Sequence, residues 1–515
     1  MSRRRFLDEP SPAGLIEPHQ TRGPLKLSAD AVVVGSGAGG ATVAATLAEA
    51  GRRVILLEEG PWYHSREYGA RFASMTGEIM RDGGATVIMG RSPIAYLEGR
   101  VVGGSTVLNG GMCWRTPEEV LARWVRERAL PDYRPERLEE TFELVEEVIS
   151  ARYQDPGSEG ENNQLFRRGA EALGWRLQQN KRNQRHCVGS NDCVTGCPSG
   201  AKQSTKRSWI PRFFQHGGEL FSHAKVRRLR TRGGRVAGVE GQLLDPLGPR
   251  PFSVEARAVV IAGGAVQTPL LLQRSGLRRI SPHLGAHFTV HPNVKVAARF
   301  PRPVESLRGV HQAWQCVEFQ EEGLLLAPGG VPLSVLTQCF PKIGAALWEE
   351  MGSAAQLATG GILIDDSVEG FVRARPFGWN QIRYDLTDED QERAVRGVCR
   401  LAELYFEAGA EEVFTPFATH PTLRHPDELA LLRKARPSLQ HTEYFTAHLM
   451  GTCRMHGEQR GGVVDGEGAV YGAPGLYLAD ASVLPSTIGV NPQVTIMALA
   501  RRIGERLGER LGALR

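Results

Sequence analysis

The chain has 515 residues, of which 41% are hydrophobic and 23% charged, a composition typical of a globular protein with two or three domains. The net charge of +5 is small for this length, and basic residues do not alternate with aromatic ones, so nucleic-acid binding is not expected. No apolar run approaches the ~18–20 residues that a membrane span needs.

The first residues, Ser2–Leu7, resemble a twin-arginine export signal, but no apolar segment follows them. We therefore interpret residues 1–27 as a solvated tail and expect a cytoplasmic protein. A misplaced start and export together with a partner subunit remain open alternatives.

The next segment has the pattern of a dinucleotide-binding unit, in which a short apolar strand, a glycine-rich turn, a helix and a second strand follow one another. Gly35 permits a tight turn, Gly37 lets the backbone approach a pyrophosphate, and Gly40 lets the helix pack on the strand. The helix start at Ala38 offers unpaired N–H groups to phosphates. Glu58, 18 residues past Gly40, is placed to accept ribose hydroxyls. The unit predicts FAD or NAD as ligand.

A second glycine-rich run, from Gly99 to Gly111, is too rich in glycine for a regular helix. Such a backbone can lie flat against a ligand. Helical periodicity then returns, and we expect helices over residues 117–128, 135–149, 163–173 and 208–216. The arginine-rich stretch 227–235 is interpreted as a charged hairpin at a solvated sheet edge.

A buried strand over residues 258–262 ends at Gly263 and precedes another helix, which repeats the order of the first unit. The sequence therefore predicts an α/β protein with a discontinuous Rossmann-type domain and an inserted α+β substrate domain. The expected limits are a tail over 1–27, a nucleotide domain over 28–294 and 441–515, and a substrate domain over 295–440. The insert has apolar stretches at 323–327, 331–336 and 360–364 and a predicted helix at 388–408.

Two motifs near the C-terminus carry the chemistry, one from His448 to Met455 and one from Gly489 to Ala498, with Gly475–Pro485 between them. Together with the two glycine-rich runs, they resemble the glucose–methanol–choline (GMC) family of FAD-dependent oxidoreductases over nearly the whole chain from residue 28. The order of four separate matches favours FAD over NAD.

The resemblance implies which residues hold FAD. Asn109 stands where some members carry a flavin-linking histidine, so the FAD is expected to be non-covalent. Pro492 suits the first position of a helix whose positive end would face the flavin. Besides the first motif and Gly263, the expected FAD contacts are Gly103, Gly104, Ser105, Asn109, Val226 through its backbone, Asp480, Ala481, Pro492 and Gln493.

The same resemblance implies the catalytic pair. His448 corresponds to the active-site histidine, and histidine suits a base because its ordinary pKa lies near neutrality. Asn491 corresponds to the second member of the pair, and it can bond the substrate oxygen but cannot titrate. His291 matches another histidine that recurs in the family, for which a structural role is equally compatible.

The cysteine segment, with Cys187, Cys193 and Cys197 followed by proline, leaves several interpretations open. Three thiolates at this spacing could hold an iron–sulfur cluster, or another metal with His186 as a fourth ligand. The segment resembles both the GMC glucose dehydrogenases that carry a three-iron cluster and the cysteine-rich insert of bacterial long-chain alcohol oxidases. A disulfide or unpaired structural thiols are the alternatives.

The resemblance implies an oxidoreductase that converts an alcohol to an aldehyde or ketone, with proton removal to His448 and hydride transfer to flavin N5. The substrate is expected to be a small-molecule alcohol, with a lipophilic one suited to the apolar insert. The electron acceptor would be O2 or a redox partner. The alternatives are a flavoprotein subunit that passes electrons through the cysteine cluster to a partner, and a lyase or photoenzyme without net oxidation.

Overall fold

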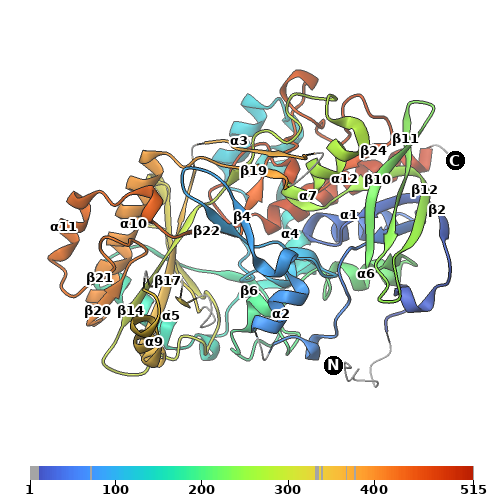
Figure 1. Ribbon diagram of the computed structural model, residues 1–515. Coiled ribbons are helices and arrows are strands. Elements are labelled where there is room, and N and C mark those ends of the chain that lie inside the picture. Colours follow the sequence, from blue (N-terminus) through green and yellow to red (C-terminus); the bar gives the residue numbers. More distant parts are fainter. Residues whose placement is uncertain are drawn as a thin grey trace.

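The computed structural model describes residues 11–69, 72–330, 336–337, 340, 342–366, 368–375 and 379–513. The segment resembling an export signal, Cys339 and most of the apolar stretch 331–336 lie outside the described residues. Two sheets organise the described part, one on the right and one on the left in Figure 1.

The right-hand sheet contains the predicted dinucleotide unit, which is confirmed. Its parallel part has the order β1-β9-β3-β2-β12, with β24 paired to the end of β12, and the antiparallel strands β11 and β10 complete one side. The strands are β1 (Leu15–Ile16), β2 (Leu25–Val34), β3 (Val54–Leu57), β9 (Glu219–Phe221), β10 (Ala224–Arg232), β11 (Arg235–Leu243), β12 (Arg250–Ile261) and β24 (Leu476–Leu478). Because three distant segments build this sheet, the domain is discontinuous, as predicted.

Apolar helices cover this sheet because their buried faces continue its core. The alanine-rich helix α1 (Ala38–Glu49) packs against α12 (Gln493–Ala513), and an ion pair between Arg501 and Glu49 links the two. The other helices of this half are α2 (Phe72–Ile79), α3 (Glu118–Glu127), α4 (Pro135–Val148), α6 (Trp209–Gln215) and α7 (Gly264–Leu272). The predicted helices over 117–128, 135–149 and 208–216 are confirmed to within two residues.

The left-hand sheet is mostly antiparallel and has the order β4-β5-β22-β14-β17-β16-β15-β7. The helices α5 (Glu161–Ala172), α10 (Asp388–Glu407) and α11 (Glu428–Ala435) share its core, and α9 (Ala345–Gly352) lies at its lower end (Figure 1). The strands are β4 (Thr86–Ile88), β5 (Ile94–Tyr96), β7 (Leu177–Gln179), β14 (Asn293–Arg299), β15 (Trp314–Cys316), β16 (Leu324–Pro328), β17 (Leu357–Ile364) and β22 (Tyr444–Thr446), with β20 (Glu412–Phe414) and β21 (Thr422–Leu423) attached to β14.

Three short pairs complete the fold, namely β13 (Thr289–Val290) with β23 (Leu449–Met450), β18 (Phe371–Arg373) with β19 (Gln381–Arg383), and β6 (Ala151–Tyr153) with β8 (Lys181–Asn183). Strands β4, β5 and β7 reach the left-hand sheet from before residue 294. The domain limits at 294 and 440 stay a prediction.

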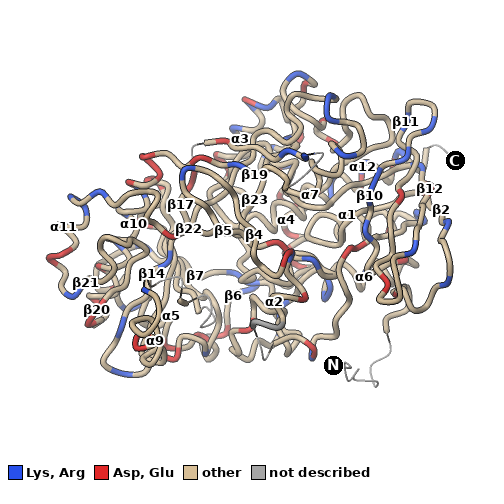
Figure 2. Tube along the Cα trace, viewed as in Figure 1, with Lys and Arg blue, Asp and Glu red and all other residues tan. Residues whose placement is uncertain are grey.

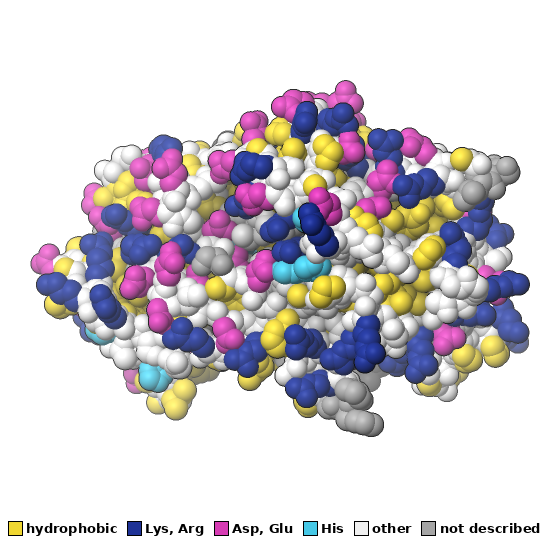
Figure 3. Space-filling view, turned by 90° about the horizontal axis from the view of Figure 1, so that it is seen from above, with side chains coloured by type: hydrophobic (Ala, Val, Ile, Leu, Met, Phe, Trp, Pro, Cys, Tyr) yellow, Lys and Arg dark blue, Asp and Glu magenta, His cyan; other side chains and the backbone are white. Residues whose placement is uncertain are grey.

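Among the described residues, no helix combines the length and apolarity required to cross a bilayer. Charges of both signs intermingle with apolar side chains on the face in Figure 3.

Candidate functional site

The first glycine-rich turn lies where the right-hand sheet meets α1. Gly35 has a φ of 98°, and a Cβ on it would lie 2.3 Å from the carbonyl oxygen of Ala262. A Cβ on Gly40 would lie 1.8 Å from the carbonyl oxygen of Gly35, so the helix can approach the strand only with glycine there. Gly39, which the sequence analysis did not single out, has the same constraint, since its Cβ would lie 1.7 Å from the carbonyl oxygen of Ala479.

Gly37 differs from its neighbours because its side faces open space. With its chain neighbours left aside, the described residues bring one heavy atom within 4 Å of a Cβ placed there, Cα of Gly104 at 4.0 Å. The second glycine-rich run crosses at this point, and the Gly103 N–H donates to Oγ of Ser36 over 2.9 Å. Ala38 begins α1 beside this space, so the helix N-terminus faces it. These residues form a cradle in which open space, a backbone turn and a helix N-terminus meet, which is the arrangement that binds a pyrophosphate.

Glu58 ends β3 at the edge of this cradle. Its Oε2 accepts hydrogen bonds from the Ser36 N–H (3.0 Å) and Oγ–H (2.6 Å), and its Oε1 accepts one from the Gly60 N–H (2.9 Å). Burial raises the pKa of Glu58. A carboxylate offers about four acceptor positions, so one is left for a ribose hydroxyl. Strand β10 starts here, because the Ala224 N–H donates to the Glu58 carbonyl, which brings Val226 near the expected adenine end.

Asp480 lies at the end of β24, on the other side of the cradle. Its carboxylate accepts from the N–H groups of Ser482 (2.7 Å) and Gly264 (2.8 Å) and from Oγ1 of Thr268 (2.5 Å). Burial raises its pKa. The side chain therefore ties the turn after Gly263 to Ala481, and the two predicted segments meet as expected.

The glycine-rich run and the start of α12 also meet. Nδ2 of Asn109 donates to Oε1 of Gln493 over 2.8 Å, and Nε2 of Gln493 donates to the carbonyl oxygen of Met112. Pro492 is buried and lies one residue before α12, which begins at Gln493, so it precedes the first helical position predicted for it. The observed residues fit FAD, because the open space beside Gly37 joins a ribose acceptor at one end and a helix N-terminus at the other.

The iron–sulfur interpretation of the cysteine segment is not supported. In the part of the chain that the structure describes, which includes all three cysteines, no group of three or more His, Cys, Asp or Glu side chains is arranged to hold a metal ion. Cys187, Cys193 and Cys197 are free thiols, so the disulfide alternative is wrong as well. The guanidinium of Arg182 donates to Sγ of Cys193 over 3.2 Å, and a cation in that position opposes metal binding.

The segment instead supports the glycine-rich run through a lysine that the sequence analysis missed. Nζ of Lys202 donates to the carbonyl oxygens of Val107 (2.7 Å), Asn109 (2.9 Å) and Cys193. Lys202 is buried, and burial lowers its pKa to about 8. Three residues on, Oγ1 of Thr205 donates to the carbonyl oxygen of Ser36 over 3.0 Å. The sequence signal was a lysine two residues after the Pro198–Gly200 turn.

Replacing Lys202 with Met should weaken FAD binding at least about tenfold, because an unpaired buried carbonyl costs about 1–3 kcal/mol and 1.4 kcal/mol is tenfold in affinity. Met keeps the length of the side chain but donates no hydrogen bond. Fluorescence titration of the FAD-free protein measures the affinity. The control is Lys26→Met, which changes an exposed lysine on β2. Equal FAD affinity in the two variants would contradict a supporting role for Lys202.

The catalytic candidates gather at one edge of the left-hand sheet because of strand direction. Strand β22 is antiparallel to β14, with Phe445 opposite Asn293, so the residues after β22 and those before β14 lie at the same edge. Strand β17 is also antiparallel to β14 and ends at this edge. His291, His448 and Asp365 are therefore brought together from positions up to 157 residues apart.

His448 lies within hydrogen-bond distance of two side chains, those of Asn491 and His291. Its Nε2 lies 3.2 Å from Nδ2 of Asn491, and its Nδ1 lies 3.0 Å from Nδ1 of His291. Burial and the neighbouring His291 hold the pKa of His448 well below its usual range. The ring is therefore neutral at pH 7, which is the form that accepts a proton. His291 has no exposed surface, and burial lowers its pKa to about 3.

One face of the left-hand sheet is half-exposed beside this pair. The strand registers place a row of residues side by side on it, namely Val87, Ala95, Phe445, Asn293, Leu363 and Leu325. Leu325 at one end of the row is 6% exposed, Val87 at the other end is 43% exposed, and the residues between them are partly exposed. Asn293 connects the row to His291, because its Nδ2 donates to the carbonyl oxygen of His291 over 3.1 Å. The row is mostly apolar, apart from Asn293 and the ammonium of Lys295, which lies 4.1 Å from the centroid of the Phe445 ring.

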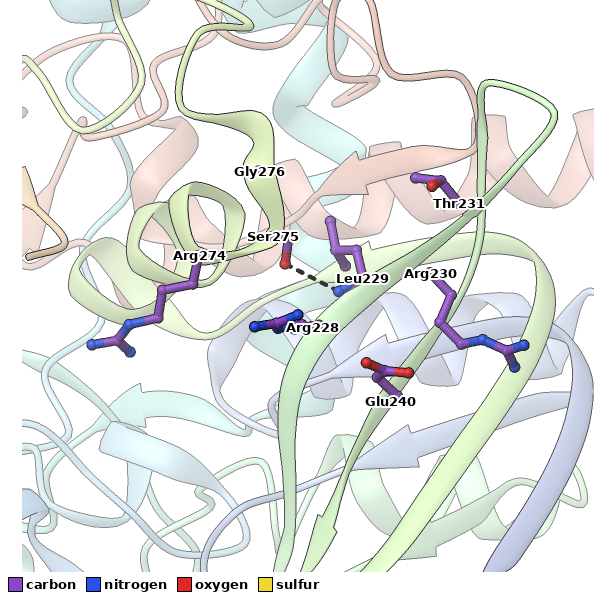
Figure 4. A pocket seen from close by; sticks show the side chains of 8 residues that line it. All are labelled: Arg228, Leu229, Arg230, Thr231, Glu240, Arg274, Ser275 and Gly276. Atoms are coloured by element: carbon purple, nitrogen blue, oxygen red, sulfur yellow. Dashed lines mark hydrogen bonds between the residues drawn. The ribbon is translucent and has the colours of Figure 1, made fainter. Parts of the chain in front are cut away.

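A hollow of about 470 Å³ lies along β10, and none of the catalytic candidates lines it (Figure 4). Arg228 and Arg230 of β10 and Arg274 after α7 line it, and Ser275 accepts from the Leu229 N–H. Strand β10 is the last strand of its sheet, and basic residues follow it and β11 in Figure 2. The predicted charged hairpin at a solvated edge is confirmed, and its arginines discourage edge-to-edge pairing.

Comparison with known proteins identifies the family. The two GMC oxidoreductase family models, N-terminal and C-terminal, match residues 76–293 and 369–500, and an FAD binding domain model matches residues 30–74. A GMC-type oxidoreductase of Sinorhizobium fredii is 36% identical over 93% of this chain and 95% of its own length. A long-chain-alcohol oxidase of Arabidopsis thaliana is 28% identical over 92% of this chain and 66% of its own length.

Among solved structures, the pyridoxine 4-oxidase from Mesorbium loti has a TM-score of 0.71 at 18% identity, covering 93% of this chain and 98% of that one. This likeness concerns the fold. It agrees with a Rossmann-type FAD-binding domain that carries an inserted α+β domain.

Proposed function

Because the chain belongs to the GMC family of FAD-dependent oxidoreductases, we propose that it oxidises a lipophilic primary alcohol to an aldehyde, with His448 as the base. The observation that carries this proposal is the pair of His448 and Asn491, whose facing nitrogens lie 3.2 Å apart at the end of an apolar, half-exposed sheet face. The name of the long-chain-alcohol oxidase supports the substrate class.

In this mechanism the neutral His448 ring takes the hydroxyl proton at Nε2. The Asn491 amide donates to the substrate oxygen and fixes the carbinol carbon, and it leaves proton removal to His448 because an amide does not titrate. Bound FAD supplies the acceptor for the hydride that leaves that carbon. The glycine cradle, Glu58 and Lys202 would hold the cofactor, and the turn at Asp480 and the start of α12 would complete its site.

The apolar row supports an extended alkyl chain as the rest of the substrate. Phe445 and Leu363 would contact the methylene groups nearest His448, and Val87 those nearest solvent. Each methylene group buried contributes about 0.8 kcal/mol, which is up to about fourfold in kcat/KM per CH2. We also propose O2 as the electron acceptor, since the named relative is an oxidase.

A panel of straight-chain primary alcohols from ethanol to hexadecanol tests the proposal. We expect kcat/KM to rise with chain length, with hydrogen peroxide as product in air. The control is Phe445→Asp, which should flatten the dependence on chain length without loss of bound FAD. Activity with an artificial acceptor, but none with O2, would indicate that a redox partner and not O2 accepts the electrons. Turnover without any acceptor would contradict the oxidoreductase proposal in favour of a lyase or photoenzyme.

A further inference from the structure

A chain of hydrogen bonds leads away from His448 on the side opposite Asn491. Nδ1 of His448 faces Nδ1 of His291 over 3.0 Å, and Nε2 of His291 faces Oγ1 of Thr487 over 2.8 Å. The Thr487 hydroxyl donates to Oδ1 of Asp365 over 3.0 Å. The chain joins three elements, because His291 precedes β14, Asp365 follows β17 and Thr487 precedes α12.

The contacts at both ends of the chain favour one direction of the hydrogen bonds. At one end, Nδ2 of Asn491 can only donate, so this contact favours the tautomer of His448 in which Nε2 accepts and carries no proton. Its proton is then on Nδ1, and His291 accepts it at its own Nδ1. At the other end, ionised Asp365 only accepts, so the Thr487 hydroxyl donates to it and receives the Nε2–H of His291.

A competing donor makes this arrangement depend on Thr487. The Gly489 N–H also points at Nε2 of His291, over a longer 3.2 Å. If it were the sole partner, Nε2 would accept, and the proton of His291 would move to Nδ1. His291 would then donate to Nδ1 of His448, whose proton would sit on Nε2, the nitrogen that has to take the proton of the alcohol.

We propose that Thr487 and Asp365 are positioning residues that hold His448, through His291, in the tautomer whose Nε2 is free to act as a base. The proposal rests on the proposed function of His448. In the alcohol reaction Nε2 of His448 gains the hydroxyl proton, and the carboxylate at the end of the chain stabilises the positive charge that the two rings share.

Several charged groups surround Asp365. Burial raises its pKa, while the hydrogen bond from Thr487 and the guanidinium groups of Arg123 and Arg393 oppose that shift. Arg123 on α3 donates to the carbonyl oxygen of Thr487, and Arg393 on α10 donates to that of Asp365 and pairs with Asp390. The adjacent Asp366 accepts from the Tyr384 hydroxyl (2.7 Å), and burial raises its pKa to about 8, so it is largely neutral at pH 7.

The test compares Thr487→Val with Thr487→Ser. Valine has the shape of threonine but no hydroxyl, so the Gly489 N–H becomes the partner of His291 and the unproductive tautomer forms. We expect kcat for the best alcohol of the panel to fall by about 10²-fold or more with KM within about twofold, because a reversed tautomer removes the base. Serine keeps the hydroxyl and should restore kcat to within about threefold of the unmodified enzyme.

The tautomer itself is measured by ¹⁵N NMR of the holoenzyme labelled at histidine, with the His448 signal assigned by its loss in His448→Ala. The unmodified protein and Thr487→Ser should show an unprotonated Nε2, and Thr487→Val a protonated one. Asp365→Asn, which can still accept from Thr487 but lacks the charge, should move the acidic limb of the kcat/KM profile to lower pH.

The outcomes separate the two proposals. If His448→Ala abolishes activity while Thr487→Val keeps full kcat and the original tautomer, the positioning role is wrong and the proposed function stands. If His448→Ala is fully active, the proposed function is wrong. A loss of kcat in Thr487→Ser equal to that in Thr487→Val would also overturn the inference, because packing rather than the hydroxyl would then be responsible.

Discussion

His448→Ala is expected to lower the rate of anaerobic flavin reduction by alcohol by about 10²- to 10⁴-fold, the usual contribution of a positioned base. His448 is neutral at pH 7 because burial and His291 lower its pKa, so the native ring accepts a proton without first losing one. Alanine leaves the alcohol proton without an acceptor. Stopped-flow absorbance of the FAD-loaded protein measures the rate.

The bound FAD and the melting temperature should stay close to those of the unmodified protein, because the cradle beside Gly37 does not include His448. His19→Ala, at an exposed position, serves as the control and should leave the rate unchanged. A reduction rate in His448→Ala that matches this control would remove His448 from the mechanism.

The dinucleotide unit was predictable because its determinants are local. The turn at Gly35, the helix start at Ala38 and Glu58, which follows β3, lie within 24 residues of one another. Each position has a physical requirement that the local sequence reveals. The predicted strand was shorter than β2, which extends back to Leu25 because β12 pairs with it over the whole length.

Of the interpretations left open for the cysteine segment, the metal site is not supported, because spacing alone does not fix where side chains point. Cys193 and Cys197 have the spacing of ligands, but buried cations lie beside them, with Arg182 at one thiol and Lys202 behind the glycine-rich run. A partner cation from β8 leaves no mark within the segment itself, so the sequence could not distinguish a metal site from a structural support.

The catalytic pair was predictable only through the resemblance, and the residues behind it were missed. Asp365 follows an ordinary apolar strand, and Thr487 lies in a loop between two motifs, so neither has a local signature. Asp365 comes near His291 because β17 ends at the edge where β14 begins, which is a property of register and not of any short segment.

Two neighbouring glycines of the first turn should respond in opposite ways to the same added methyl group. Gly37→Ala should leave the FAD-free protein folded, because its φ of −69° suits alanine and its Cβ would meet nothing closer than 4.0 Å. The methyl group would instead occupy the space expected for the pyrophosphate. We expect FAD affinity to fall by about 10²-fold or more, a loss of about 2.7 kcal/mol.

Gly39→Ala places its methyl group 1.7 Å from the carbonyl oxygen of Ala479, and backbone rather than a flexible side chain must then move. Overpacking of this kind costs about 1–3 kcal/mol or more, so the FAD-free protein itself should melt earlier. Thermal melts with and without FAD distinguish the two variants, because a ligand stabilises only the protein that binds it. Gly37→Ala should melt normally without FAD and gain less from FAD than the unmodified protein, whereas Gly39→Ala should melt early in both conditions. An FAD-dependent rise in Gly37→Ala equal to that of the unmodified protein would show that the pyrophosphate lies elsewhere.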